Sequence, residues 1–151
     1  MSVYLDTSFL CSLYRLQHTS PHAVEFKDRF AGPLPVSSLL LLEFRQSVRF
    51  QNRLFGKDRS KGFSEKEGAA MLRALHSDLA AGILKMASPD WVDVHRIGEE
   101  LSAKHTQTNG HRLVDILHVA TAIHLGKEQF LTFDANQKRL AEAEGMVVPL
   151  P

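Results

Sequence analysis

Four acidic residues occupy positions at which an α/β protein would bring chemistry together. Asp6 directly follows a short β-prone run, Val3-Tyr4-Leu5, and Asp134 directly follows another, over residues 130–133. Glu43 lies in the opening turns of a helix that is expected after a third such run. Because the carboxyl ends of parallel strands meet at one edge of a sheet, we expect these three side chains near that edge.

The fourth acid, Asp115, reaches the same edge through its helix. A short connection joins the apolar helical pattern over residues 113–125 to the strand over 130–133. Because the connection is short, the helix and the strand run antiparallel. The start of the helix, with Asp115, therefore lies beside the end of the strand, with Asp134. The sequence thus predicts four carboxylates from distant parts of the chain at one sheet edge.

Such a group of carboxylates predicts a metal site. Neighbouring carboxylates cannot all stay ionised without a counter-charge, because like charges raise one another's pKa values. All-oxygen ligation selects Mg²⁺ or Mn²⁺, and such an ion activates water and neutralises charge that builds on a phosphodiester. We therefore predict metal-assisted phosphodiester hydrolysis. The expected catalytic residues and metal ligands are Asp6, Glu43, Asp115 and Asp134.

Each acid also has a purely structural interpretation. Asp6 can cap the helix that follows it, and Asp134 with Gln137 resembles a capping box. Glu43 can be a solvated helix position. Asp115 suits the helix dipole in a first turn, but its apolar surroundings demand a partner if the side chain is buried.

Short β-prone runs alternate with helical patterns along the chain. We expect helices over 7–14, 20–30, 38–55, 64–82 and 113–125, a helix opening at Ser88-Pro89 that breaks over 105–110, and a last helix over 134–143. Strands are expected over 3–5, 34–37, 83–87, 130–133 and 146–148. This order predicts a three-layer α/β/α sandwich with a mainly parallel sheet of four or five strands.

Length and composition exclude several other classes of protein. The 151 residues are 44% hydrophobic and 23% charged with a net charge of +1, which indicates a single folded domain over 1–151. No apolar run is long enough to span a membrane, and the first residues do not resemble a signal peptide. The single cysteine, Cys11, excludes an internal disulfide and cysteine-rich zinc sites. We therefore expect a cytoplasmic protein.

Four stretches around the acids occur in one order along nearly the whole chain. They are Tyr4-Leu5-Asp6-Thr7-Ser8, Leu42-Glu43-Phe44-Arg45, Leu113-Val114-Asp115-Ile116-Leu117-His118-Val119-Ala120-Thr121-Ala122 and Leu131-Thr132-Phe133-Asp134. With them the chain resembles the PIN-domain ribonucleases and is similar to the VapC toxins of bacterial type II toxin–antitoxin pairs. The third stretch is the most specific.

This resemblance implies a PIN-like fold and an acidic quartet that holds one or two Mg²⁺ or Mn²⁺ ions and cleaves RNA. It gives Ser8 and Thr132 as hydroxyls near the first and fourth acids. Asn136 stands where some relatives carry a further Asp, so a fifth ligand here would be neutral and act through water. The resemblance also implies a cognate antitoxin protein and a homodimer.

Basic residues and one histidine add to this hypothesis. Arg45, Arg49, Arg53 and Lys57 recur every four residues on the helix of Glu43. They form a stripe that can follow an RNA backbone, or else a solvated face or a surface for an acidic partner.

His118 follows Asp115 by one helical turn. It can bond a carboxylate or approach the scissile phosphate, or it can be a satisfied buried group.

Two other classes compete with the endoribonuclease. Phosphotransfer receivers and aspartate-nucleophile phosphatases need a pair of acids near the first strand, whereas Asp6 stands alone before Thr7 and Ser8. A catalytically silent PIN-like module that binds RNA or protein is the second alternative. Such a module is expected to lack some of the acids, and this chain has all four.

Overall fold

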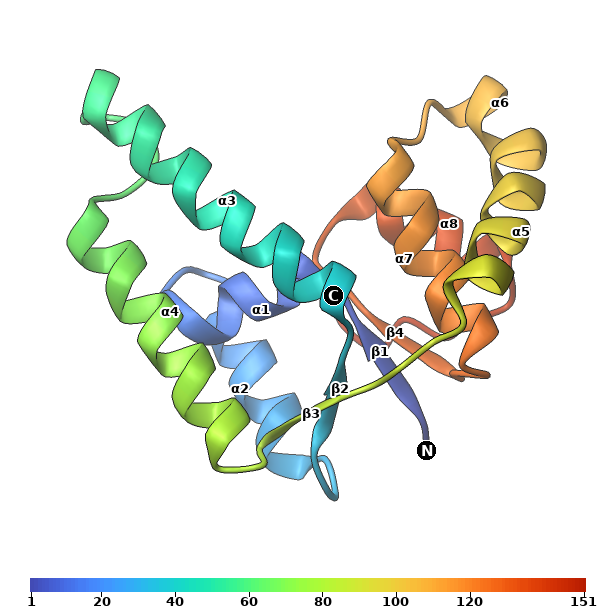
Figure 1. Ribbon diagram of the computed structural model, residues 1–151, viewed down its shortest axis with the longest axis horizontal. Coiled ribbons are helices and arrows are strands. Elements are labelled where there is room, and N and C mark those ends of the chain that lie inside the picture. Colours follow the sequence, from blue (N-terminus) through green and yellow to red (C-terminus); the bar gives the residue numbers. More distant parts are fainter. The chain divides into compact units, whose positions relative to one another are not determined.

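Pairs of parallel strands among helices make up the structure, a computed structural model that describes residues 1–151 (Figure 1). The chain divides into two units. The first unit comprises Met1–Phe9 and Ala87–Pro151, and the second comprises Leu10–Met86. Each unit holds one parallel pair of strands. The predicted α/β class with parallel strands is thereby confirmed, although the four strands form two pairs rather than the single sheet of four or five strands that the sequence predicted.

The first unit is built around the strands that open and close its sequence. Its elements are β1 (Val3–Leu5), α5 (Trp91–Leu101), the π-helix η1 (Ser102–Thr106), α6 (Gln107–Asn109), α7 (Leu113–His124), β4 (Gln129–Leu131) and α8 (Ala135–Ala143). β1 pairs with β4 so that Tyr4 lies opposite Phe130. The expected last strand is reduced to a single bridge between Gln129 and Val147.

The core of the first unit explains why α7 is apolar on nearly every side. Buried side chains of β1, β4, α5, α7 and α8 form one cluster, in which Tyr4 stacks on Phe130 with ring centroids 5.3 Å apart. α7 packs mainly against α5. Seven of its residues are buried, among them Asp115 and His118. Polar groups on this helix therefore need partners inside the unit.

The second unit holds the long basic helix. Its elements are α1 (Thr7–Tyr14), whose first residues belong to the first unit, α2 (Ser20–Arg29), β2 (Leu34–Val36), α3 (Ser38–Lys57), α4 (Glu65–Ala80) and β3 (Leu84–Met86). β2 and β3 pair in parallel. α3 and α4 approach closely at Gly68, where a Cβ atom would lie 2.8 Å from the Asn52 amide and 2.9 Å from Val48.

Several helix ends were predictable from capping residues. Ser64 and Asp134 cap α4 and α8 by accepting from the backbone N–H three residues later, at 3.2 and 2.8 Å. The predicted start of α2 at Ser20 is confirmed, but one predicted start was wrong, because α5 begins after Asp90 rather than at Ser88-Pro89. The Asp90 carboxylate accepts from two backbone N–H groups of α5, a stronger cap than the serine offers.

The predicted break over 105–110 was also wrong. Helical backbone continues from α5 through η1 and α6 and stops only at Gly110, whose φ of 70° is left-handed. Neither Gly nor Pro occurs over residues 99–109, so nothing forces an earlier end. β4 in turn ends at Leu131, which places Asp134 in the connection between strand and helix rather than directly after the strand.

Candidate metal centre

Asp6 is a buried carboxylate that three donors hold in place. It extends the pairing of β1 with β4, because its N–H donates to the Leu131 carbonyl at 3.1 Å. The residue is 4% exposed. Its Oδ1 accepts from Ser8 Oγ at 2.6 Å and from Phe9 N at 3.2 Å, and its Oδ2 accepts from Thr132 Oγ1 at 2.6 Å. Asp6 thus caps α1 and is also oriented by two hydroxyls.

The surroundings of Asp6 disfavour its charged form. Burial raises the pKa of this carboxyl above its ordinary value. The hydrogen bonds and the charge of nearby His118 lower the pKa, but burial outweighs them, and no lysine or arginine is among the groups that act on it. A cation beside this carboxylate would offset the cost of ionising it.

Thr132 connects Asp6 to Asp134. The hydroxyl that donates to Asp6 also accepts from the backbone N–H of Asp134 at 3.0 Å. Ser8 acts in the same way, since its hydroxyl donates to Asp6 and accepts from Phe133 N at 2.9 Å. Asp134 is exposed, and its cap of α8 uses only Oδ1. The predicted hydroxyls therefore hold the segment of Asp134 against Asp6.

Asp115 differs from Asp6 because it has a cationic partner. It lies in the first turn of α7 and is 7% exposed. Arg112 donates from Nε to Oδ2 at 3.0 Å and from Nη2 to Oδ1 at 3.2 Å. Sequence reasoning missed this partner, although the spacing of three residues on a helix predicts such pairs.

His118 is a buried side chain in a hydrogen bond with a core tyrosine. Its Nδ1 lies 2.6 Å from the Tyr4 hydroxyl, and the residue is 1% exposed. It also acts electrostatically on Asp6. The structural interpretation of His118 thus has a defined partner, and the residue also lies close enough to Asp6 to act on it electrostatically.

Asn136 bonds to residues outside the acidic group. Its Nδ2 lies 3.3 Å from His111 Nδ1, and its Oδ1 accepts from Arg139 Nη2 at 3.0 Å. Burial lowers the pKa of His111, and the neighbouring His105 lowers it further. Sequence reasoning missed His111, which no motif singles out.

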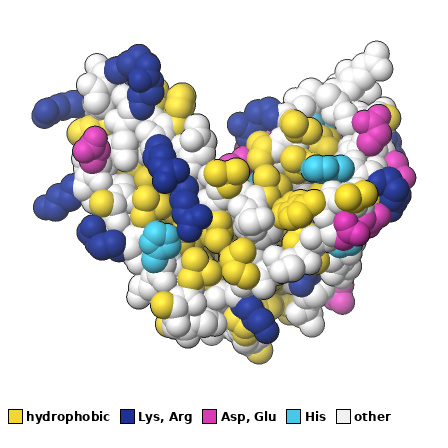
Figure 2. Space-filling view, viewed as in Figure 1, with side chains coloured by type: hydrophobic (Ala, Val, Ile, Leu, Met, Phe, Trp, Pro, Cys, Tyr) yellow, Lys and Arg dark blue, Asp and Glu magenta, His cyan; other side chains and the backbone are white.

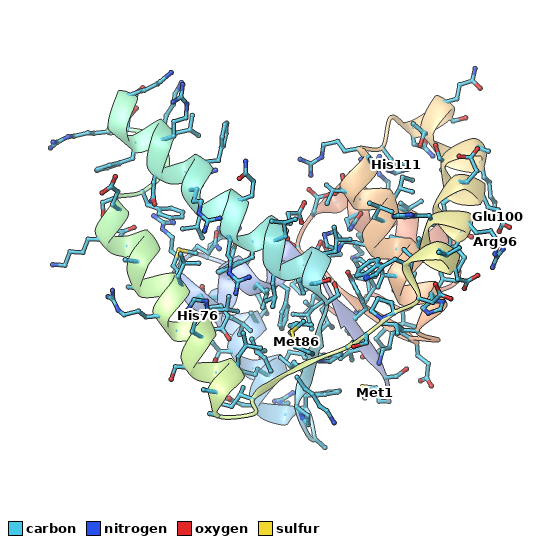
Figure 3. The ribbon with its side chains drawn as sticks, viewed as in Figure 1. Met1, His76, Met86, Arg96, Glu100 and His111 are labelled. Carbon is cyan, nitrogen blue, oxygen red and sulfur yellow. The ribbon has the colours of Figure 1, made fainter.

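Glu43 and the basic residues belong to α3 of the second unit. Glu43 is half-buried, in the second turn of the helix. Arg49 and Arg53 are exposed, whereas Arg45 is half-buried and its Nη2 lies 3.2 Å from Nε2 of His76, which Figure 3 labels on α4. On the face viewed in Figure 2, Lys and Arg side chains gather over the second unit with few acidic ones among them.

The acids suit a hard cation by their chemistry. Carboxylate oxygens are the ligands that Mg²⁺ and Mn²⁺ prefer, and at Asp6 burial outweighs the groups that favour the charged form. In this structure no group of three or more His, Cys, Asp or Glu side chains is arranged to hold a metal ion. The metal ligands therefore stay a prediction that rests on the type of donor and the electrostatics of Asp6.

Solved structures with the same fold include two kinds of protein. VapC20 of Mycobacterium tuberculosis, a Sarcin-Ricin loop cleaving toxin, is 17% identical with a TM-score of 0.70, over 99% of this chain and 100% of that one. FitAcB from Neisseria gonorrhoeae is 20% identical with a TM-score of 0.58, over 97% and 95%. FitAB bound to the IR36 DNA fragment is 19% identical with a TM-score of 0.65, over 97% and 92%.

Sequence comparison extends this likeness to a family. None of the helices of this chain combines the length and apolar character needed to cross a membrane. No curated protein matches the chain.

The model of one family, the PIN domain, matches residues 3–143. This range runs through both units and includes all four acids. The chain therefore belongs to the PIN domain family.

Proposed function

We propose that this chain is a single PIN domain over 1–151 that acts in the cytoplasm as a metal-dependent endoribonuclease. The observation that carries the proposal is Asp6, a buried carboxylate that two hydroxyls orient and whose pKa burial raises. Burying a carboxylate whose charge is only partly compensated lowers the stability of a fold. Acids whose pKa values are perturbed in this way are found preferentially at functional sites. Membership of the PIN family supports the same activity.

The acids and the hydroxyls of this chain would have separate roles. Asp6, Asp115 and Asp134 of the first unit, with Glu43 of the second, would hold Mg²⁺ or Mn²⁺. Such an ion supplies activation of water and neutralisation of charge at the phosphodiester. Ser8 and Thr132 keep both oxygens of Asp6 in one orientation.

Arg112 has a separate role in the metal-free protein. It compensates the buried charge of Asp115 from an exposed position, its side chain being 73% exposed against 10% for that of Asp115. A metal ion at Asp115 would therefore replace this guanidinium as the partner of a buried carboxylate, which needs one.

Arg49 and Arg53 would bind the RNA backbone, and Arg45, which bonds with His76, would contribute less. The double variant Arg49→Ala with Arg53→Ala should weaken RNA binding and flatten its dependence on salt. On single strands, the logarithmic slope should fall by about 0.7 for each phosphate that the variant no longer neutralises. An unchanged slope would assign these arginines to a protein partner or to solvent.

The biological role that we propose is that of a toxin with a cognate antitoxin protein and a homodimeric form. The likeness to VapC20, which is described as a toxin, supports this role. Co-expression with the product of an adjacent small reading frame should suppress cleavage and yield a stable complex. Cleavage that persists in the presence of that product would contradict the pairing.

The activity itself is tested with a mixed RNA pool in Mg²⁺ or Mn²⁺. We expect wild type to cut, and expect both EDTA and Asp115→Asn to stop cutting while the variant keeps its far-UV spectrum. Calorimetric titration of Mn²⁺ measures metal binding separately. A wild-type chain that neither cuts RNA nor binds metal would be a catalytically silent PIN module.

A further inference from the structure

A small pocket in the first unit is lined by hydrogen-bond donors and lies beside the candidate centre. Its volume is about 80 Å³. It is bounded by η1 and α6, the turn before α7, and α8. The lining residues are His105, Asn109, His111, Arg139, Leu140 and Ala143. No carboxylate is among them, and Arg139 brings a permanent positive charge.

The hydrogen bonds around this pocket determine which donors face it. Asn136 Oδ1 accepts from Arg139, so its Nδ2 is the group that donates to His111 Nδ1. The proton of neutral His111 is then on Nε2, where it serves as a donor. Arg139 uses one N–H in this network and keeps the rest of its guanidinium free to donate.

Glu144, which bonds to the lining residue His105, is a carboxylate that is already compensated. Glu144 accepts from Lys104 Nζ and lies within hydrogen-bond distance of His105 Nε2, both at 2.9 Å. Burial works to raise the pKa of Glu144, but these two partners outweigh it and leave the pKa lowered. Glu144 therefore holds His105 in place without making the pocket repel an anion.

The size of the pocket limits what it can hold. Pockets for whole organic ligands measure about 300–1,000 Å³, several times the volume of this pocket, about 80 Å³. One tetrahedral anion matches that size better than a whole nucleotide does. A guanidinium, an imidazole N–H and an amide are a donor set that suits phosphate oxygens.

The pocket is also joined to the candidate centre through the chain. His111 stands one residue before Arg112, the partner of Asp115, and the Asp115 carboxylate acts electrostatically on His111. Asn136, which bonds to both His111 and Arg139, follows the Asp134 cap on α8. An anion in the pocket would therefore lie near the segments that carry Asp115 and Asp134.

We infer that this pocket binds a phosphate of the RNA chain that neighbours the phosphate being cut. The inference rests on the proposed nuclease function and names how that site positions its substrate. π-Helical turns occur frequently at functional sites, and η1 is the turn that carries His105 into the pocket wall. Arg139 is the main phosphate ligand, His111 donates from Nε2, and His105 closes the wall.

The RNA experiment measures binding in EDTA, so that cleavage plays no part. Arg139→Gln should weaken binding of single-stranded RNA several-fold and reduce the salt slope by about 0.7, as expected when one phosphate is no longer neutralised. Arg96→Gln is the matched control, because it removes the same charge from α5 of the same unit, where Arg96 pairs with Glu100 (Figure 3). Equal affinities and slopes for the two variants would overturn the inference.

Inorganic phosphate tests the pocket without RNA. We expect phosphate to shift the His111 ring resonances of the full-length wild type in NMR spectra, saturably, and to leave them unmoved in Arg139→Gln. A response that is absent in wild type, or unchanged in Arg139→Gln, would overturn the pocket whatever the nuclease assay shows. A normal phosphate response in a chain that cuts no RNA would instead contradict the proposed function alone.

Discussion

Asp6 and Glu144 are two sheltered acids of the same unit with opposite electrostatics. Burial raises the pKa of Asp6, and its hydroxyl and backbone partners together with nearby His118 do not overcome that effect. Glu144 is bonded to Lys104 and His105, which overcome the effect of burial and lower its pKa. Glu144 thus stabilises the fold by being charged, whereas a charged Asp6 works against it.

This difference separates an acid kept for stability from one kept for function. A fold selected only for stability would give Asp6 a lysine or arginine partner or an apolar replacement. Its hydroxyl partners instead fix the position of the carboxylate without neutralising it. Substitutions at the two acids and at their partners test this difference. The largest effect is expected at Asp6.

Replacing the Asp6 carboxylate should remove activity without unfolding the chain. Loss of groups that merely support a metal ligand costs about 10- to 100-fold, so Asp6→Asn should lower RNA cleavage at least about 100-fold. Cleavage of a mixed RNA pool with Mn²⁺ measures the effect, and Asp28→Asn on exposed α2 is the control. A variant that still cuts at the wild-type rate would make Asp6 a helix cap only.

Removing one hydroxyl should cost both activity and stability. Thr132→Val deletes the donor to Asp6 and the acceptor of Asp134 N. We expect cleavage to fall about 10- to 100-fold and the free energy of unfolding to fall by about 1–3 kcal/mol, because buried partners stay unpaired. Urea unfolding and cleavage rates check this, with Thr108→Val on α6 as control. Unchanged cleavage at reduced stability would limit Thr132 to folding.

The metal-free protein should become less stable as pH rises, through Asp6. In the unfolded chain this carboxyl ionises near pH 4, whereas in the folded state its raised pKa keeps it protonated to higher pH. As pH rises above about 4, ionisation therefore stabilises the unfolded state more than the folded state, and the free energy of unfolding falls. Asp6→Asn should therefore gain stability relative to wild type between pH 4 and pH 8 in EDTA. A difference in unfolding free energy that stays flat with pH would show that Asp6 is compensated. Adding Mn²⁺ should stabilise wild type only.

Glu144 should show the opposite and smaller dependence. Its lowered pKa means that its stabilising effect is present above the ordinary value of 4.5 and is lost as pH falls through the folded-state pKa. Glu144→Gln should lower the free energy of unfolding by up to about 1 kcal/mol at pH 7, as partly exposed ion pairs do, and match wild type in acid. A loss that persists in acid would indicate packing rather than charge.

Much of the fold was predictable because local rules act within a few residues. The capping residues Ser64 and Asp134, the alternation of strands and helices and the apolar surface of α7 all depend on near neighbours. The weak points were positions where two local signals competed. At Asp90 a carboxylate displaced Ser88-Pro89 as the helix start.

The candidate site was predictable in its residue types but not in its contacts. That an acid follows β1 can be seen in the sequence, and family resemblance pointed to Ser8 and Thr132. That both hydroxyls donate to Asp6 depends on β1 and β4 being adjacent strands, a pairing of residues more than 120 apart in the chain. Arg112 was predictable from its spacing to Asp115, whereas no local pattern in the sequence pointed to His111.

The π-helical turn η1 has a consequence for sequence change in this region. A π-turn inserted in an α-helix holds one residue more than an α-turn, and one residue corresponds to a rotation of about 100° about the axis. Deleting a single residue between Ser102 and Thr106 would therefore remove the extra residue and leave a regular α-helix whose flanking turns keep their register. Inserting a residue into regular helix elsewhere would instead rotate everything beyond it by about 100°.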